Sequence, residues 1–166
     1  VPAVVVILVL LSKIVEILGV SDWGRLMVMA MASFGTFLTT FAVVINNHLI
    51  AAMCVMVASY AVVQVWVVGR RETRWVVMAG LFASLAMAMD LPCGLLLAVL
   101  GIGLLFTLPR ATLLAGLPVV LVVVALSVGT NFLAHRTLLP PYAFRDAGQD
   151  WQEGNWYVYD YHVGSR

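Results

Sequence analysis

The chain has 166 residues, of which 63% are hydrophobic and 10% are charged, and its formal net charge is +1. Because an ordinary soluble domain has about 25% charged residues, this composition excludes a typical soluble protein and predicts several membrane spans. No basic run interleaved with aromatic residues suggests nucleic acid, so we expect no nucleic-acid partner. Membrane lipid is the expected surrounding.

The apolar runs predict an all-α protein, a polytopic transmembrane helix bundle of about six spans over residues 1–133. The expected spans are residues 1–18, 26–45, 49–68, 75–89, 91–108 and 111–133. The first is short, so we expect it to begin upstream of Val1. The fourth and fifth are also short and join at Asp90-Leu91-Pro92, because proline lacks a backbone donor and disfavours helix in the preceding residue. Pro118 is a candidate kink in the sixth span.

Basic residues fall in alternate loops between these spans. They are Arg25, Arg70, Arg71, Arg74 and Arg110, and Lys13 lies near the end of the first span, on the same side as Arg25. By the positive-inside rule these loops are cytoplasmic. The other loops hold residues 46–48, Asp90 and the polar, aromatic segment 134–166, which we therefore expect on the extracytoplasmic side of a bacterial inner membrane. We expect that last segment to be incomplete.

Small side chains and cysteines suggest packing and not chemistry. Gly80, Ser84 and Ala88 recur every four residues, a spacing that lets another helix approach closely. Cys54 and Cys93 have no metal-ligand spacing and are expected to pack as small apolar residues. We therefore predict no metal site.

Polar residues at two turns are the candidate substrate-binding residues. Asn46, Asn47 and His48 lie between two apolar runs, where polar groups are costly unless they face water, a cavity or a partner. Asp90 is the carboxylate that lies well inside the apolar region. The alternatives are a polar tip at the lipid surface for residues 46–48, and for Asp90 a cap on the next helix.

The C-terminal segment mixes aromatic and polar residues in a way that suits carbohydrate. Asn155, Trp156 and Tyr157 are candidate sugar contacts, because aromatic faces stack on sugar C–H surfaces while amides bind hydroxyls. The alternative is an aromatic belt at the lipid–water interface. The chain has no hydrolase, metalloprotease or nucleotide-binding motif of known spacing.

Two stretches resemble a known group of membrane enzymes. Residues 41–62 form an apolar run, a small polar tip and a long apolar helix, and residues 79–92 read Ala-Gly-Leu-Phe-Ala-Ser-Leu-Ala-Met-Ala-Met-Asp-Leu-Pro. Both are similar to polytopic GT-C-type glycosyltransferases, in the protein mannosyltransferase, aminoarabinose transferase and RgtA/B/C/D-like group. Asp90 stands where that group often has a lysine.

The resemblance implies an enzyme that transfers a sugar from a polyprenyl-phosphate carrier to a glycan, lipid or protein acceptor on the outer face. It also implies that the catalytic carboxylate lies upstream of residue 1, so that no catalytic residue is assigned here. No cofactor is expected besides the lipid-linked sugar donor. The alternatives are a secondary transporter with a site at Asp90, and a non-catalytic membrane scaffold protein.

Overall fold

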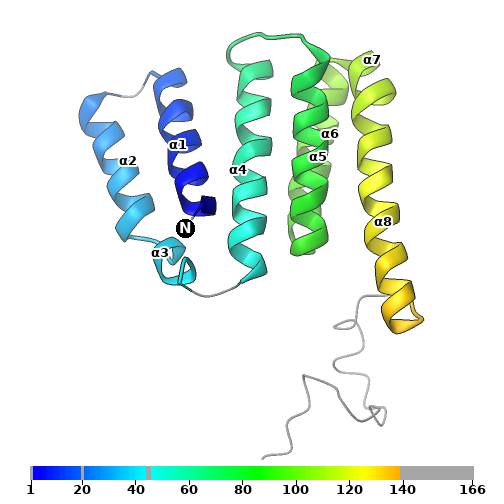
Figure 1. Ribbon diagram of the computed structural model, residues 1–166. Helices are drawn as coiled ribbons and strands as arrows, with labels where there is room; N and C mark the ends of the chain where they lie inside the picture. Colours follow the sequence, from blue (N-terminus) through cyan, green and yellow to red (C-terminus); the bar gives the residue numbers. More distant parts are fainter. Residues whose placement is uncertain (1, 20, 44–45, 139–166) are drawn as a thin grey trace, which may run out of the picture. The chain divides into compact units, whose positions relative to one another are not determined.

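The computed structural model describes residues 2–19, 21–43 and 46–138. The chain divides into two units, residues 1–126 and 127–166. The described part is helical and contains no strand, which confirms the all-α prediction (Figure 1). Its elements are α1 (Pro2–Ile17), α2 (Asp22–Phe34), α3 (Leu38–Phe41), α4 (Asn47–Trp66), α5 (Thr73–Met89), α6 (Cys93–Thr107), α7 (Pro109–Ala111), a π-helical segment (Thr112–Gly116) and α8 (Leu117–His135).

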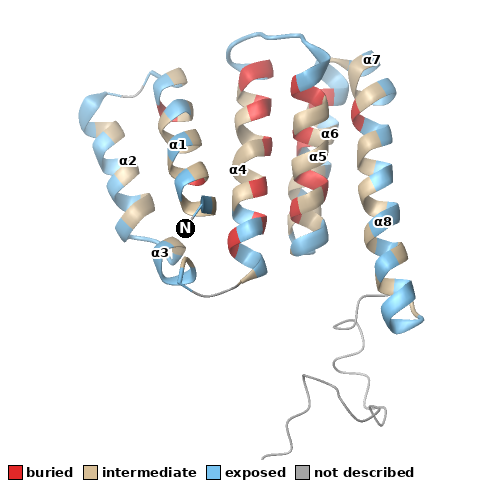
Figure 2. Ribbon diagram, viewed as in Figure 1, coloured by how far each residue is buried: buried red, intermediate tan, exposed pale blue. Residues whose placement is uncertain are grey.

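The core of unit 1 lies between α4 and its neighbours. Helix α4 packs against α1 on one side and α5 on the other, and α5 also packs against α6 and the π-helical segment (Figure 1). Buried residues concentrate on α4 and α5 (Figure 2). The core cluster consists of Ala58, Ala61, Val62, Val65, Trp75, Val76, Ala79, Ala83, Leu100 and Leu104. Four alanines among these ten side chains let the helix backbones approach closely.

Two of the three small residues spaced four apart on α5 lie at helix contacts. A Cβ on Gly80 would lie 3.2 Å from the carbonyl oxygen of Gly116, so this glycine allows the π-helical segment to approach α5. Ser84 is fully buried, and its hydroxyl donates to the carbonyl of Gly80 at 2.7 Å. Ala88 is exposed. These small residues therefore support helix packing at Gly80 and Ser84 but not at Ala88.

The predicted span 26–45 is wrong as a single helix. Helix α2 begins four residues earlier, at Asp22, where Ser21 caps it by accepting a hydrogen bond from the backbone of Gly24. It ends at Phe34. The hydroxyl of Thr36 donates to the carbonyl of Ala32 and accepts from the amide of Leu38. A threonine that bonds nearby backbone in this way competes with the helix, which explains the break before α3.

A π-helical segment interrupts the last apolar stretch just before the proline that was predicted as a kink. The amide of Leu117 donates to the carbonyl of Thr112, which is the i to i+5 pattern of a π turn. Pro118 lacks an amide hydrogen and its ring crowds the carbonyl four residues earlier, that of Leu114. A wider turn relieves this crowding while the helix continues from Pro109 to His135.

Two helices are long and apolar enough to cross a membrane by length and composition. They are Asn47–Trp66, with 20 residues, and Pro109–His135, with 27. Helices α5 and α6 are apolar but shorter, with 17 and 15 residues. These lengths give two candidate spans where the sequence predicted about six.

In unit 2 the described residues are 127–138. Helix α8 continues in this unit to His135, and the next residue, Arg136, has a positive φ of 58°. The side-chain amide of Asn131 donates to the carbonyl of Thr137 at 2.8 Å. The predicted sugar contacts Asn155, Trp156 and Tyr157 lie outside the described residues.

Candidate functional site

The polar tip at residues 46–48 is the start of α4. The side-chain oxygen of Asn46 accepts a hydrogen bond from the amide of His48 at 2.7 Å, and the backbone of Asn46 is extended (φ −139°, ψ 132°). This is the geometry of an asparagine N-cap, which satisfies one of the free amides at a helix start. The cap holds Asn47 and His48 in the first turn, where the partial positive charge of the helix lies.

Two successive residues of this turn bind two successive residues at the end of α5. The side-chain amide of Asn47 donates to the carbonyl of Met89 at 2.7 Å. Nδ1 of His48 lies 2.8 Å from Oδ2 of Asp90. The structure thus brings together the two polar turns that the sequence singled out.

The side chain of Asp90 therefore binds a residue of α4 and does not cap α6. The residue before α6 is Pro92, and no side-chain hydrogen bond caps α6 within the described residues. The backbone of Asp90 still takes part in the turn, since its carbonyl accepts from the amide of Cys93 at 2.9 Å. Its carboxylate is left to bind His48, so the capping alternative is not what the structure has.

The His48–Asp90 pair is partly open to solvent. The side chain of His48 is 54% exposed and that of Asp90 is 29% exposed. Nδ1 is the donor in the tautomer that pairs with an ionised carboxylate, because such a carboxylate only accepts hydrogen bonds. Nε2 of His48 has no hydrogen bond with the described residues and is available to a ligand. The ring of Phe41 lies 6.5 Å from the imidazole, centroid to centroid.

A groove of about 430 Å³ extends from this pair along α1 and α4. Its lining residues are Ile7, Leu11, Ala32, Thr36, Leu38, His48, Ala51, Ala52, Val55, Met56, Asp90 and Cys93. His48 and Asp90 are the acid–base pair of this lining, and most of the other residues are apolar. We call this cavity the His48 groove. It combines one polar corner with a long apolar wall.

This arrangement can bind hydroxyl groups and can accept a proton. The free carboxylate oxygen accepts from a hydroxyl, and a neutral imidazole fixed through Nδ1 presents its Nε2 lone pair, which is the form of a general base. The described residues contain no group of three or more His, Cys, Asp or Glu side chains that could hold a metal ion. The side chains of His48 and Asp90 thus offer acid–base and hydrogen-bonding chemistry at this corner.

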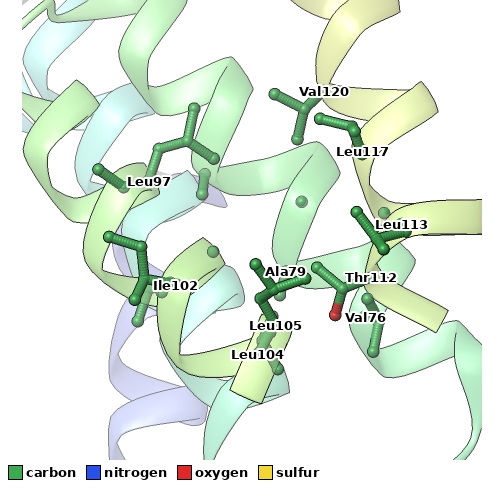
Figure 3. Close-up of a pocket in the computed structure, with 16 residues that line it drawn as sticks. Val76, Ala79, Leu97, Ile102, Leu104, Leu105, Thr112, Leu113, Leu117 and Val120 are labelled. Carbon is green, nitrogen blue, oxygen red and sulfur yellow. The ribbon is translucent and has the colours of Figure 1, made fainter. Parts of the chain in front are cut away.

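A second cavity, of about 370 Å³, lies between α5, α6 and the π-helical segment (Figure 3). Thr112 is the residue with a hydroxyl in its lining, and that hydroxyl donates to the carbonyl of Leu108 at 2.9 Å. The remaining lining, including Val76, Leu97 and Val120, is apolar. The lining of this cavity contains no charged side chain.

Sequence reasoning missed the apolar wall of the His48 groove. Thr36 and Ile7 belong to segments that looked like ordinary membrane spans, and only the packing of α1 against α4 brings Ile7 to the site. It also missed Gln64, whose buried side-chain oxygen has no hydrogen-bond partner among the described residues. Gln64 could have been noticed because it is a glutamine near the end of an apolar run. The positions of Thr36 and Ile7 in the groove had no such signal in the sequence.

Comparison with known proteins gives no relative for this chain. It matches no family model, no curated protein and no solved structure. A function for the chain therefore has to be argued from the site itself.

Proposed function

We propose that the chain belongs to an integral-membrane glycosyltransferase of GT-C type, in which it forms part of a polytopic helix bundle. The enzyme transfers a sugar from a polyprenyl-phosphate carrier to an acceptor on the extracytoplasmic face. The apolar composition and two helices of membrane-spanning length support the membrane location. Support for the transfer comes from the His48 groove.

The observation that carries the proposal is the 2.8 Å contact between His48 and Asp90 at the corner of an otherwise apolar groove. A lipid-linked sugar has the complementary form, with a long apolar chain and a polar head. Its chain fits the wall formed by residues such as Leu11 and Val55. Its sugar, or the acceptor hydroxyl, then meets the polar corner.

Each polar residue has a separate role in this proposal. Asp90 binds a sugar hydroxyl and orients His48, and Nε2 of His48 binds or deprotonates a second hydroxyl. Asn47 is a positioning residue, because its bond to the Met89 carbonyl holds the end of α5 beside the first turn of α4. Asn46 positions both through the helix cap. No catalytic carboxylate is assigned to residues 1–166.

The test is Asp90→Asn in membranes that contain the complete protein. The amide keeps the size of the side chain but removes the charge, so we expect sugar transfer from a polyprenyl-phosphate donor to fall while expression is unchanged. Asp22→Asn is the matched control, because Asp22 is a carboxylate in the first turn of α2 and is not in the groove. Unchanged transfer with Asp90→Asn would remove the His48 groove from the reaction.

The transporter alternative has less support from the geometry. Transporters place their sites at broken helices near the middle of the membrane. Asp90 lies instead in a short turn between α5 and α6, which pack against each other. Uptake of a labelled solute that depends on Asp90 in sealed vesicles, without sugar transfer, would favour a transporter.

A further inference from the structure

A third cavity lies in unit 1 where the C-terminal ends of α4 and α6 meet. It has a volume of about 670 Å³ and is lined by Val65, Trp66, Gly69, Arg71, Gly103, Phe106, Thr107 and Leu108. We call it the Arg71 recess. Its lining combines the guanidinium of Arg71 with aromatic and aliphatic side chains. It shares no lining residue with either cavity described above.

The charged side chains next to Arg71 in sequence each contact another side chain. The guanidinium carbons of Arg70 and Arg74 lie 5.3 and 5.0 Å from the centroid of the Trp75 ring, which is cation–π geometry. Glu72 accepts from Nε1 of Trp75 at 2.9 Å and from Arg74 at 3.3 Å. Glu72 is the one carboxylate in this loop, so its engagement with Trp75 and Arg74 leaves Arg71 unneutralised.

Arg71 itself is exposed and makes no hydrogen bond or ion pair with the described residues. A free guanidinium at a recess is a ready partner for a phosphate, which it can bind with two parallel hydrogen bonds. The C-terminal ends of α4 and α6 carry about half a negative charge each. Arg70, Arg71 and Arg74 carry three positive charges, and after subtraction of the negative charge of Glu72 the net charge still exceeds those partial charges.

The opposite wall of the recess suits an alkyl chain at a lipid surface. Phe106 is 83% exposed and Trp66 is 44% exposed. Nε1 of Trp66 donates to the hydroxyl of Thr107 at 3.3 Å, which holds the indole against α6 with its polar edge at the helix end. Tryptophan in this setting marks the level of the lipid headgroups.

We propose that the Arg71 recess binds the headgroup of an anionic phospholipid, with the phosphate on Arg71 and the first part of an acyl chain along Phe106 and Leu108. Arg110 follows two residues after Leu108 and adds positive charge at the same end of α6. A zwitterionic lipid fits less well, because its own cation is repelled by this cluster. This inference requires membrane location but not sugar transfer.

The experiment is native mass spectrometry of the complete protein released from detergent, titrated with phosphatidylglycerol or with phosphatidylcholine of the same acyl chains. We expect phosphatidylglycerol to bind more tightly, and Arg71→Gln to weaken it about fivefold, since one basic residue at a membrane surface contributes about that factor. Lys13→Gln is the matched control, with the same charge change outside the recess. Phe106→Ser is expected to weaken the same complex.

Two results would overturn the proposal. One is that the wild type and Arg71→Gln retain phosphatidylglycerol equally, when thermal unfolding shows that both proteins are folded. The other is that Lys13→Gln and Arg71→Gln weaken binding by the same factor, which would mean general attraction to a basic surface. Displacement of the lipid by millimolar inorganic phosphate would remove the acyl-chain contact from the proposal and contradict it in that form.

Discussion

Gly103 on α6 is the position where one added methyl group tests the packing of the structure most directly. A Cβ built on Gly103 would clash with Cζ2 of Trp66 and would lie 2.8 Å from Cη2 of the same ring. Gly101, two residues earlier on the same helix, has nothing within 4 Å of its added Cβ. Gly101→Ala and Gly103→Ala therefore make the same chemical change in crowded and open surroundings.

The two variants are expected to change the free energy of unfolding in opposite directions. Alanine in a helix interior is favoured over glycine by about 1 kcal/mol, so Gly101→Ala is expected to stabilise the protein by that amount. Gly103→Ala gains the same term but displaces the indole, which loses its hydrogen bond to Thr107, worth about 1 kcal/mol, and its packing against α6. Overpacking of this kind, with the lost hydrogen bond included, costs about 1–3 kcal/mol. The expected difference between the variants is about 2 kcal/mol.

Thermal unfolding of each variant in the same detergent measures this difference. For a chain of this size it corresponds to a gap in Tm on the order of 5 °C, with Gly101→Ala the more stable. Thr107→Val serves as a control, because it removes the hydrogen bond of Trp66 and leaves Gly103 in place. If Gly103→Ala proves as stable as Gly101→Ala, Trp66 does not lie against Gly103 and the wall of the Arg71 recess is misassigned.

Two further predictions concern the charged groups. A double-mutant cycle with His48→Ala and Asp90→Ala should give a coupling of about 0.5–1 kcal/mol in unfolding free energy, the range for a partly exposed pair; additive effects would contradict the contact. The pKa of Glu72 is held below its ordinary value of 4.5 by a hydrogen bond from its own backbone, then by Trp75 and the nearby arginines. Because this pKa is lower in the folded state, the stabilisation is fully present above pH 4.5 and is lost as the pH falls through the folded value. The fall in Tm on acidification to pH 3 should thus be smaller in Glu72→Gln than in the wild type, and identical profiles would argue against the Glu72 contacts.

The polar turns were predictable from the sequence because each interrupts an apolar run. Charge alternation between loops assigned residues 46–48 and Asp90 to the same side, and the contact between His48 and Asp90 agrees with that assignment. The partner of Asn47 was not predictable. A backbone carbonyl such as that of Met89 has no signature in the sequence.

The breaks inside apolar runs were harder to predict for a physical reason. The end of α2 depends on the hydroxyl of Thr36 bonding to the backbone on both sides, and threonine also occurs inside packed helices of membrane proteins. The π-helical segment depends on how a helix accommodates Pro118, which can also be done with a kink. The walls of the cavities depend on tertiary packing, which hydrophobic pattern does not encode.

The contacts at the start of α4 also depend on the register of α4 against α5. His48 and Asp90 are 42 residues apart in sequence and sit at the free ends of a hairpin whose other end is closed by residues 67–72. A slide of α5 along α4 by one residue would move Asp90 by about 1.5 Å and turn it by about 100°, which would break its bond to His48 and the Asn47 bond at once. Apolar packing brings the two helices together, and the two hydrogen bonds at the start of α4 are satisfied in only one alignment of α4 and α5.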